Sequence, residues 1–368
     1  MSVEGAVDGP VLVIGTGLIG TSIALSLRRA GVDVVLEDAN PSALQEAVYR
    51  AAATVLVDHE PAVVVVEVPP DAASAVLADA SSRFPAATLT DTTSVKGMIL
   101  DEAVRAGADP HRLVGGHPMA GRETSGPGAA RDDLLDDRLW ILTPSGSEGE
   151  EHLARVRQLV ATCGASALEL DPAEHDAAVA VVSHAPQVVA SALAAILVDE
   201  PAERIHIAGQ GLADTTRVAG SDPQLWTQIL RANAGPVRGV LQAVADRLNQ
   251  ALDSLTIDSD HQQLPVASEH MAGMTEVLEQ GRHGRSRLPG KHGAAAVRFA
   301  VVPVMVADKP GELARLFVAA GDLEVNLEDV RIEHVLGRPS GLVDLFVRPD
   351  VEEILIEGLM RLGFDVRA

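Results

Sequence analysis

The chain has 368 residues and a formal net charge of −23 at pH 7, a length that predicts about two or three compact domains. A surface this acidic argues against nucleic acids and anionic membranes as partners, and the single Cys163 excludes an internal disulfide and a multi-cysteine zinc site. No apolar run of membrane-spanning length and no basic leader is evident in the sequence, so we expect a cytoplasmic protein with no membrane segment.

Short β-branched segments alternate with helical patterns in the first half of the chain. The expected strands are Val11–Ile14, Val32–Leu36, Val63–Val68, Ala87–Asp91, Leu113–Gly115, Trp140–Leu142 and Ala165–Leu170. The helical patterns between them include Thr21–Ala30, Asp71–Ala80 and Val95–Ala106. Several of the strands are apolar throughout, as parallel strands buried on both faces are. This alternation predicts an α/β domain, a Rossmann-type doubly wound sheet, over residues 8–171.

The segment from residue 172 to residue 281 contains helical patterns and no convincing strand. It begins with Asp171-Pro172-Ala173-Glu174, which has the composition of a helix start. Helix breaks are expected near Pro201, Gly220 and Gly235-Pro236. We therefore expect an all-helical second domain at 172–281. A linker rich in glycine and basic residues is expected at 282–296.

Strand patterns return near the end of the chain. The expected strands are Val297–Val306, Val325–Glu333, Leu342–Val347 and a short closing strand, with helices after Asp308-Lys309-Pro310-Gly311 and from Val351. The order βαββαβ in about seventy residues is that of a small split-βαβ sandwich. A third domain is therefore expected at 297–368.

The loop after the first strand has the pattern of a dinucleotide site. Gly15-Thr16-Gly17-Leu18-Ile19-Gly20 follows the strand directly and opens a helix, which is the context that GxGxxG requires. The first glycine permits the tight turn, the second lets the backbone approach a pyrophosphate, and the third lets the helix pack on the strand. The helix N-terminus then offers free amides to the phosphates.

An acidic residue at the end of the second strand indicates which dinucleotide binds. Asp38 lies about where an acid pairs with the adenosine ribose, and its charge would repel the additional phosphate of NADP, so NAD is expected. Glu37 could serve instead, or Asp38 could be an ordinary strand-end acid. The expected cofactor contacts are Gly15, Gly17, Leu18, Ile19, Gly20, Asp38, Val68, Pro69 and Thr93.

Three further stretches carry polar residues where ligands would meet them. Asp91-Thr92-Thr93-Ser94-Val95-Lys96 lies at the end of a strand and the start of a helix, where ligands bind in such sheets. Gly115–Gly121 holds His117 in a loop between glycines and a proline. Ser183-His184-Ala185-Pro186-Gln187 lies inside a long helix that Pro186 should kink.

These motifs, taken in order, resemble those of the prephenate and arogenate dehydrogenases of tyrosine biosynthesis. The matching pieces are GTGLIG, DTTSVK, GGHPMAG followed by E-x-SG, SHAP, and TTRVAGSDPQLW from Thr215 to Trp226, over roughly residues 10–285. The last segment resembles an ACT domain, with DKPGEL at 308–313 and Val325-Asn326-Leu327. The resemblance therefore covers nearly the whole chain.

The resemblance implies an oxidoreductase that converts prephenate to 4-hydroxyphenylpyruvate by NAD-dependent oxidative decarboxylation. His117 matches the catalytic base that accepts the C4 hydroxyl proton, a role suited to an imidazole. Ser94 matches the residue that hydrogen-bonds the same hydroxyl and orients the histidine. Arg217 matches the cation that binds a substrate carboxylate. His184, next to Ser183, matches a histidine on the substrate side, and no metal is implied.

One departure from the family pattern concerns the substrate. Many members read S-H-x-P-H, whereas this chain has Gln187 at the second histidine position. Gln187 leaves the choice between prephenate and arogenate open, and prephenate is favoured.

The resemblance also implies a homodimer formed through the helical domain. It further implies an aromatic amino acid effector, with tyrosine favoured, at Gly311, Asn326 and Leu327.

Each candidate residue also has a purely structural interpretation. The alternatives are a loop residue for His117, a helix N-cap for Ser94, an ion pair with Asp214 for Arg217, and a packed helix residue for His184. His175 and His206 are interpreted as structural, and Trp226 as a packing residue.

Two other functions compete with this one. A dehydrogenase of the β-hydroxyacid family would depend on a lysine in the helical domain, and the chain has none between Lys96 and Lys291. A non-catalytic regulator that binds NAD and an amino acid is the alternative from a different class, and the His, Ser and Arg set argues against it.

Overall fold

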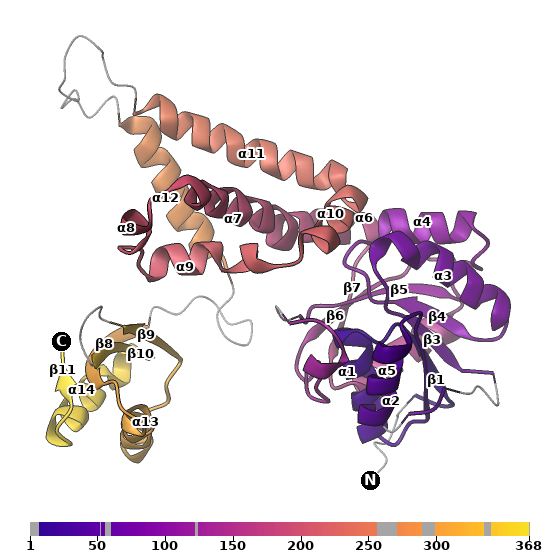
Figure 1. The fold of residues 1–368 in the computed structure, drawn as a ribbon, viewed down its shortest axis with the longest axis horizontal. Helices are drawn as coiled ribbons and strands as arrows, with labels where there is room; N and C mark the ends of the chain where they lie inside the picture. The colour runs from indigo at the N-terminus through magenta and orange to yellow at the C-terminus, as the bar shows by residue number, and fades with distance from the viewer. Residues whose placement is uncertain are drawn as a thin grey trace. The chain divides into compact units, whose positions relative to one another are not determined.

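The computed structural model describes residues 7–51, 53–55, 60–121, 124–255, 271–288, 299–334 and 340–367. The chain divides into two units, Met1–Val244 and Ala245–Ala368, which we describe separately (Figure 1). Parts of three expected features lie outside the described residues: the linker from residue 289 onward, the start of the strand at Val297, and Arg122 and Glu123 after the GGHPMAG motif.

The first unit is built on a seven-stranded sheet with the order β2-β1-β3-β4-β5-β6-β7. The strands are β1 (Val11–Ile14), β2 (Val34–Glu37), β3 (Val63–Val66), β4 (Thr88–Asp91), β5 (Leu113–Pro118), β6 (Leu139–Thr143) and β7 (Ser166–Glu169). Neighbouring strands are parallel except β5 and β6, which are antiparallel. Because β1 lies between β2 and β3, the strand order reverses there, and a ligand crevice is expected at that edge.

Helices cover both faces of this sheet (Figure 1). They are α1 (Leu18–Arg29), α2 (Pro41–Ala51), α3 (Pro70–Arg83), α4 (Gly97–Arg105) and α5 (Glu150–Thr162), with a short η1 (Pro127–Ala129). Val11 and Val13 of β1 belong to the buried cluster on the α1 and α5 face, whereas Leu12 and Ile14 belong to the cluster on the α3 and α4 face. Successive strand residues point to opposite faces, so a strand covered on both sides must be apolar throughout.

The rest of the first unit is helical, as expected. Its elements are α6 (Pro172–Val179), a π-helical turn η2 (Ala180–His184), α7 (Ala185–Ile196), η3 (Leu197–Asp199), α8 (Ala202–Ile205), α9 (Gln210–Thr216), η4 (Arg217–Gly220), α10 (Pro223–Ala232) and α11 (Ala234–Asp253), the last of which continues into the second unit. Asp171 caps α6 by accepting a hydrogen bond from the Ala173 amide at 2.8 Å. The third break falls at Asn233 and not at Gly235-Pro236, because a proline is tolerated in the first turn of α11.

Pro186 has a different local effect from the expected simple kink. The residues before it, Ala180–His184, form a π-helical turn, and α7 resumes at Ala185. Proline has no amide hydrogen, so the regular hydrogen bond to the preceding turn cannot form. The wider turn accommodates that loss and carries His184 at its end.

The helical run from Pro172 to Asp199 corrects one expectation from the sequence. Within the described part of the chain it is the single helix long and apolar enough, by length and composition, to cross a membrane, with 28 residues. Polar side chains scattered along this segment interrupt its apolar runs, so the sequence shows no continuous apolar stretch of that length. One such helix is weak evidence for a membrane span, because core helices of soluble proteins pass the same test.

The second unit contains the end of α11, the helix α12 (Ala272–Ser286) and a four-stranded antiparallel sheet of order β11-β8-β10-β9. Its chain order is β8 (Ala300–Ala307), α13 (Glu312–Asp322), β9 (Asp329–His334), β10 (Ser340–Val347), η6 (Pro349–Val351), α14 (Glu352–Arg361) and β11 (Asp365–Val366). Burial alternates along β10, because one face of the sheet packs on the apolar core that it shares with α13 and α14.

Two boundaries in this unit differ from the sequence prediction. The helix α12 continues through residues 282–286, where a linker was expected, and its basic last-turn residues His283 and Arg285 suit a helix C-terminus. The second strand begins at Asp329 and not at Val325. Glu324 has a φ of +56°, and the Val325 amide bonds back to the Ala320 carbonyl at 3.1 Å, which closes α13.

Candidate active site

The glycine loop after β1 approaches its surroundings too closely for any other residue at two positions. Gly15 has a φ of +103°, and a Cβ there would lie 1.6 Å from the carbonyl oxygen of Glu67. A Cβ on Gly20 would lie 2.1 Å from the Gly15 carbonyl oxygen. Gly17 is the N-cap of α1 and has no side chain to cap the helix. The first-turn amides are therefore presented at the loop, and this cradle fits the pyrophosphate of a dinucleotide.

Asp38 is held against this loop, immediately after β2. Its Oδ2 accepts hydrogen bonds from the Thr16 amide at 2.6 Å and the Thr16 hydroxyl at 2.7 Å, and its Oδ1 accepts one from the Asn40 amide at 2.7 Å. Glu37, the alternative acid, is instead paired with Arg83 at 2.6 Å. Of these two acids, Asp38 is thus the one that the fold orients toward the loop.

A cavity of about 770 Å³ runs from the glycine loop to β5. Nine of the residues that line it bear on the expected chemistry: Gly15, Gly17, Ile19, Asp38, Val68, Pro69, Thr93, Ser94 and His117. Two predicted cofactor contacts do not line it: Leu18 is buried, and Gly20 packs against Gly15. One cavity therefore joins most of the candidate cofactor residues to both candidate catalytic residues.

His117 lies in a strand and not in the loop that its neighbours suggested. It belongs to β5 and pairs with Ile141 of β6. The two glycines before it permit close packing: a Cβ on Gly115 would lie 2.3 Å from the Thr143 hydroxyl, and one on Gly116 would lie 2.6 Å from the Asp91 carbonyl oxygen. Glycine in a strand marks close approach as well as turns, which explains the misplaced boundary.

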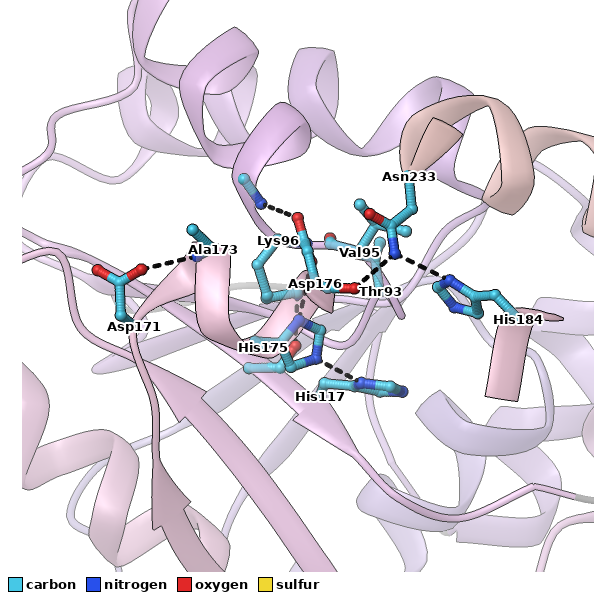
Figure 2. Close-up of polar contacts among 12 residues, drawn as sticks. Thr93, Val95, Lys96, His117, Asp171, Ala173, His175, Asp176, His184 and Asn233 are labelled. Carbon is cyan, nitrogen blue, oxygen red and sulfur yellow. Dashed lines mark hydrogen bonds and ion pairs between the residues drawn. The ribbon is translucent and has the colours of Figure 1, made fainter. Parts of the chain in front are cut away.

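Three side chains form a hydrogen-bonded chain that ends at His117 (Figure 2). Nδ1 of His117 lies 2.8 Å from Nε2 of His175, and Nδ1 of His175 lies 2.8 Å from Oδ1 of Asp176. Burial acts to raise the pKa of Asp176, but hydrogen bonds from His175 and from the amides of Lys96 and Gly97 hold it below its ordinary value. Asp176 is therefore a carboxylate that can only accept.

The direction of these bonds assigns the tautomers. Because Asp176 accepts, His175 carries its proton on Nδ1 and its Nε2 accepts from Nδ1 of His117. Nε2 of His117 is then left with a free lone pair. Burial lowers the pKa of His117 well below its ordinary value, and the nearby charge of Lys96 lowers it further. His117 is thus a neutral imidazole that can accept a proton at Nε2.

A second histidine joins the same network through an amide. Nδ2 of Asn233 donates to the backbone carbonyl of Asp176 at 2.8 Å and to Nδ1 of His184 at 3.0 Å (Figure 2). His184 therefore carries its proton on Nε2, and this buried atom has no partner among the described residues. Burial lowers the pKa of His184 to about 4. The ring of Trp226 lies edge-on to it at 6.0 Å.

None of the four substrate-side candidates, His184, Ser183, Gln187 and Arg217, lines the cavity. Ser183 is half-buried in the π-helical turn, and Gln187 is buried on α7 with its Nε2 3.4 Å from the Ser191 hydroxyl. Arg217 is exposed at the start of η4.

The sequence motif DTTSVK contains a buried ion pair that the sequence analysis did not single out. Lys96 donates to the Asp91 carboxylate and to the carbonyl oxygen of Gly116, directly before His117. Burial lowers the pKa of Lys96, and Asp91 opposes that effect. Lys96, and not Ser94, is the N-cap position of α4. Ser94 instead lines the cavity.

The positions missed from the sequence are Asp91, Lys96, His175, Asp176 and Asn233. The one available signal was the adjacent pair His175-Asp176 near the start of a helix, an unusual place to bury two titratable residues. Their partners are distant along the chain, so no local pattern joins them.

The effector candidates lie in the second unit. Gly311 has a φ of +92° and is the N-cap of α13. Leu327 packs against the core of this unit, whereas Asn326 is exposed and donates to Glu328 at 3.0 Å.

Comparison with known proteins relates the chain to one family. The family model described as "Prephenate dehydrogenase, nucleotide-binding domain" matches residues 23–169, and the one described as "Prephenate dehydrogenase, dimerization domain" matches residues 171–272. A probable prephenate dehydrogenase, NovF, from Streptomyces niveus is 36% identical over 357 residues, which are 95% of this chain and 97% of that protein.

Two solved structures share the fold at similar identity. Prephenate dehydrogenase from A. aeolicus, in complex with hydroxyphenyl propionate and NAD+, is 29% identical, with a TM-score of 0.65 over 76% of this chain and 97% of that one. Synechocystis arogenate dehydrogenase is 28% identical, with a TM-score of 0.61 over 75% of this chain and 98% of that one.

Proposed function

The chain belongs to the prephenate dehydrogenase family and is an NAD-dependent dehydrogenase, and we propose that His117 is the base of its oxidative decarboxylation of prephenate. The observation that carries this proposal is the chain from Asp176 through His175 to His117, which leaves Nε2 of His117 free in the cavity. NAD, when bound, accepts the hydride from ring carbon 4.

The chemistry requires an acceptor for the C4 hydroxyl proton as that carbon becomes carbonyl-like. A neutral imidazole with a fixed tautomer meets this requirement without losing a proton first. His175 and Asp176 are positioning residues: they hold the proton of His117 on Nδ1 and stabilise the imidazolium that forms. Ser94, which lines the same cavity, would hydrogen-bond the same hydroxyl and orient it toward Nε2.

The substrate carboxylates need donors, and two residues are proposed for them. His184 is neutral and presents a buried Nε2 hydrogen that lacks an acceptor, so a carboxylate or carbonyl oxygen would satisfy it. Arg217 would supply a bidentate cation. Ser183 and Gln187, on the same helical run as His184, would meet the substrate side chain.

The cofactor is NAD, and the proposed contacts are those of the glycine loop together with Asp38, Val68, Pro69 and Thr93. Asp38 is anchored to Thr16 and Asn40 so that its carboxylate stays at the loop edge. A carboxylate held there would accept hydrogen bonds from the ribose hydroxyls of NAD and would repel the additional phosphate of NADP.

The test is an assay of the purified chain with prephenate or arogenate against NAD or NADP, following NADH absorbance. The proposal expects the highest kcat/KM with prephenate and NAD. A preference for arogenate would transfer the same mechanism to the amino acid, whereas no turnover with either substrate would reject it in favour of a non-catalytic role.

We further propose that the chain forms a homodimer through its helical domain. The run from Pro172 to Asp199 exposes Val181, Val182, Ile196 and Val198 by 57%, 62%, 62% and 82%. Several exposed apolar side chains on one helical run favour burial against another protein surface, and the matching family model is named for dimerization. Sedimentation of a Val182→Glu, Ile196→Glu variant as a monomer would support this, and an unchanged assembly would reject it.

The βαββαβ unit is proposed to be an ACT-like regulatory domain that binds an aromatic amino acid. Tyrosine is the proposed ligand. Gly311, whose positive φ opens the loop before α13, and Asn326 and Leu327 ahead of β9 would contact it. Calorimetry of the full chain with tyrosine should show binding that Asn326→Ala weakens. Absence of binding would reject this role.

A further inference from the structure

The carboxylate of Glu67 lies on the glycine loop, where the cofactor's phosphates would meet it. Glu67 follows β3 directly and lines the same cavity as Gly15 and Gly17. Its Oε2 accepts a hydrogen bond from the Gly17 amide at 3.3 Å, and it lies 3.2 Å from where a Cβ on Gly20 would be. The acidic side chain of Glu67 therefore accepts a hydrogen bond from one amide of the cradle. That same cradle should bind the anionic phosphates of the cofactor.

The charged groups around Glu67 do not neutralise it. Asp38, across the loop, adds a like charge. Glu37 and Asp79, which line the same cavity, share Arg83 between them. Among the described residues no cation forms a salt bridge with Glu67. A dinucleotide would add two phosphate charges to this site, and a like charge nearby disfavours the ionised form of a carboxyl.

A protonated carboxyl would turn this repulsion into an attraction. It carries an O–H that can donate to a phosphate oxygen, whereas the ionised form can only accept. We propose that Glu67 is a cofactor-binding residue that receives NAD as its neutral acid, so that binding is coupled to the uptake of a proton. This inference rests on NAD binding at the glycine loop.

The titration of Glu67 agrees with that assignment. Burial raises the pKa of Glu67 to about 8, and the Asp38 charge raises it further, whereas hydrogen bonds from the backbone amides of Gly17 and Gly20 act to lower it. Near neutral pH most molecules therefore already carry the proton. Above that pKa the proton must be taken up during binding, and the apparent affinity for NAD falls as the pH rises.

Calorimetric titration of the full chain with NAD, across pH and in buffers of different ionisation enthalpy, tests the coupling. We expect NAD to bind roughly tenfold more weakly near pH 9 than near pH 7, with uptake of close to one proton at the higher pH. In Glu67→Gln, an isosteric neutral variant, both the pH dependence and the proton uptake should disappear. Asp79→Asn removes a carboxylate from the same cavity but not from the loop, and it should behave like the unaltered chain.

ADP-ribose, which keeps the pyrophosphate and lacks nicotinamide, should show the same pH dependence as NAD. A pH-independent affinity of the unaltered chain for NAD would overturn the proposal while leaving NAD binding intact. So would a pH dependence that persists in Glu67→Gln or is absent with ADP-ribose. Failure to bind NAD at any pH would instead overturn the nucleotide site itself. If Glu67→Gln does not fold, proton uptake during NAD binding by the unaltered chain still tests whether binding is coupled to protonation.

Discussion

Nδ1 of His117 lies 2.8 Å from Nε2 of His175, and this hydrogen bond joins the central sheet to the first helix of the helical domain. The proposed base is thus oriented by a residue from another part of the fold. Asp176, which holds His175, also accepts from the first amides of α4. Alignment of the base and docking of α6 on the sheet therefore depend on the same carboxylate.

Substitution of His175 should separate orientation of the base from stability. In His175→Gln we expect kcat to fall by about 10- to 100-fold, because the partner that orients His117 is lost. The melting temperature should change little, because the amides at the start of α4 still donate hydrogen bonds to the Asp176 carboxylate. Asp176→Asn should lose both kcat and stability. In His175→Gln, a steeper or shifted acid limb in the pH profile of kcat would show that the titration of the His117 imidazole has changed. Wild-type kcat in that variant would remove His175 from the mechanism.

Removal of the proposed base should affect turnover and not cofactor affinity. His117→Asn is expected to lower kcat by two orders of magnitude or more, the usual range for loss of a general base. The dissociation constant of NAD, measured by calorimetry, should stay close to that of the unaltered chain. His206→Asn, an exposed histidine of the helical domain, serves as the control and should turn over normally.

Arg217 should act through substrate binding. Arg217→Ala is expected to raise KM for prephenate by roughly tenfold or more while kcat and KM for NAD change little, since a lost carboxylate contact weakens binding. Arg204→Ala, an exposed arginine on α8, is the matched control. An unchanged KM for prephenate would show that Arg217 lies outside the site.

Breaking the buried pair between Lys96 and Asp91 should destabilise the fold strongly. Neither side chain is exposed, so Lys96→Met leaves an uncompensated buried carboxylate, a loss of about 3–5 kcal/mol. The double variant Lys96→Met, Asp91→Asn should lose less than the sum of the two single changes. Urea unfolding measures these free energies, with the exposed Lys309→Met as control. Additive losses would contradict a coupled pair.

The stability of the fold should fall in mild acid because of His184. Burial lowers its pKa from the ordinary 6.5 to about 4, so the unfolded chain binds a proton over a range in which the folded chain does not. The stability from the neutral imidazole is present above about pH 6.5 and is lost as the pH falls toward 4, on the order of 3 kcal/mol in total. Urea unfolding near pH 7 and pH 4.5 should show a smaller decrease in His184→Gln, and an equal decrease would assign the effect elsewhere.

Several features were predictable because they depend on residues close together in the chain. The strand, glycine loop and helix that begin the first domain follow from periodicity and from turn chemistry over about twenty residues. The position of Asp38 beside the glycine loop follows from its offset along the second strand. Errors occurred where one residue type serves two purposes. Gly116, interpreted as a loop residue beyond the end of the strand, allows close packing within β5.

The hydrogen-bonded chain behind His117 depends on packing and could not be predicted in this way. His117 and His175 are separated by 58 positions, and Asp176 meets Lys96 across 80. Their contacts exist because α6 packs against α4 and β6. Hydrophobic periodicity shows which face of a helix is buried but not against which element. Burial in turn sets the pKa values of His117, His184 and Glu67. The local sequence thus specified the glycine-loop cradle and indicated His117 as the candidate base. The protonation states of His117 and Glu67 arise instead from desolvation and from distant partners in the folded chain.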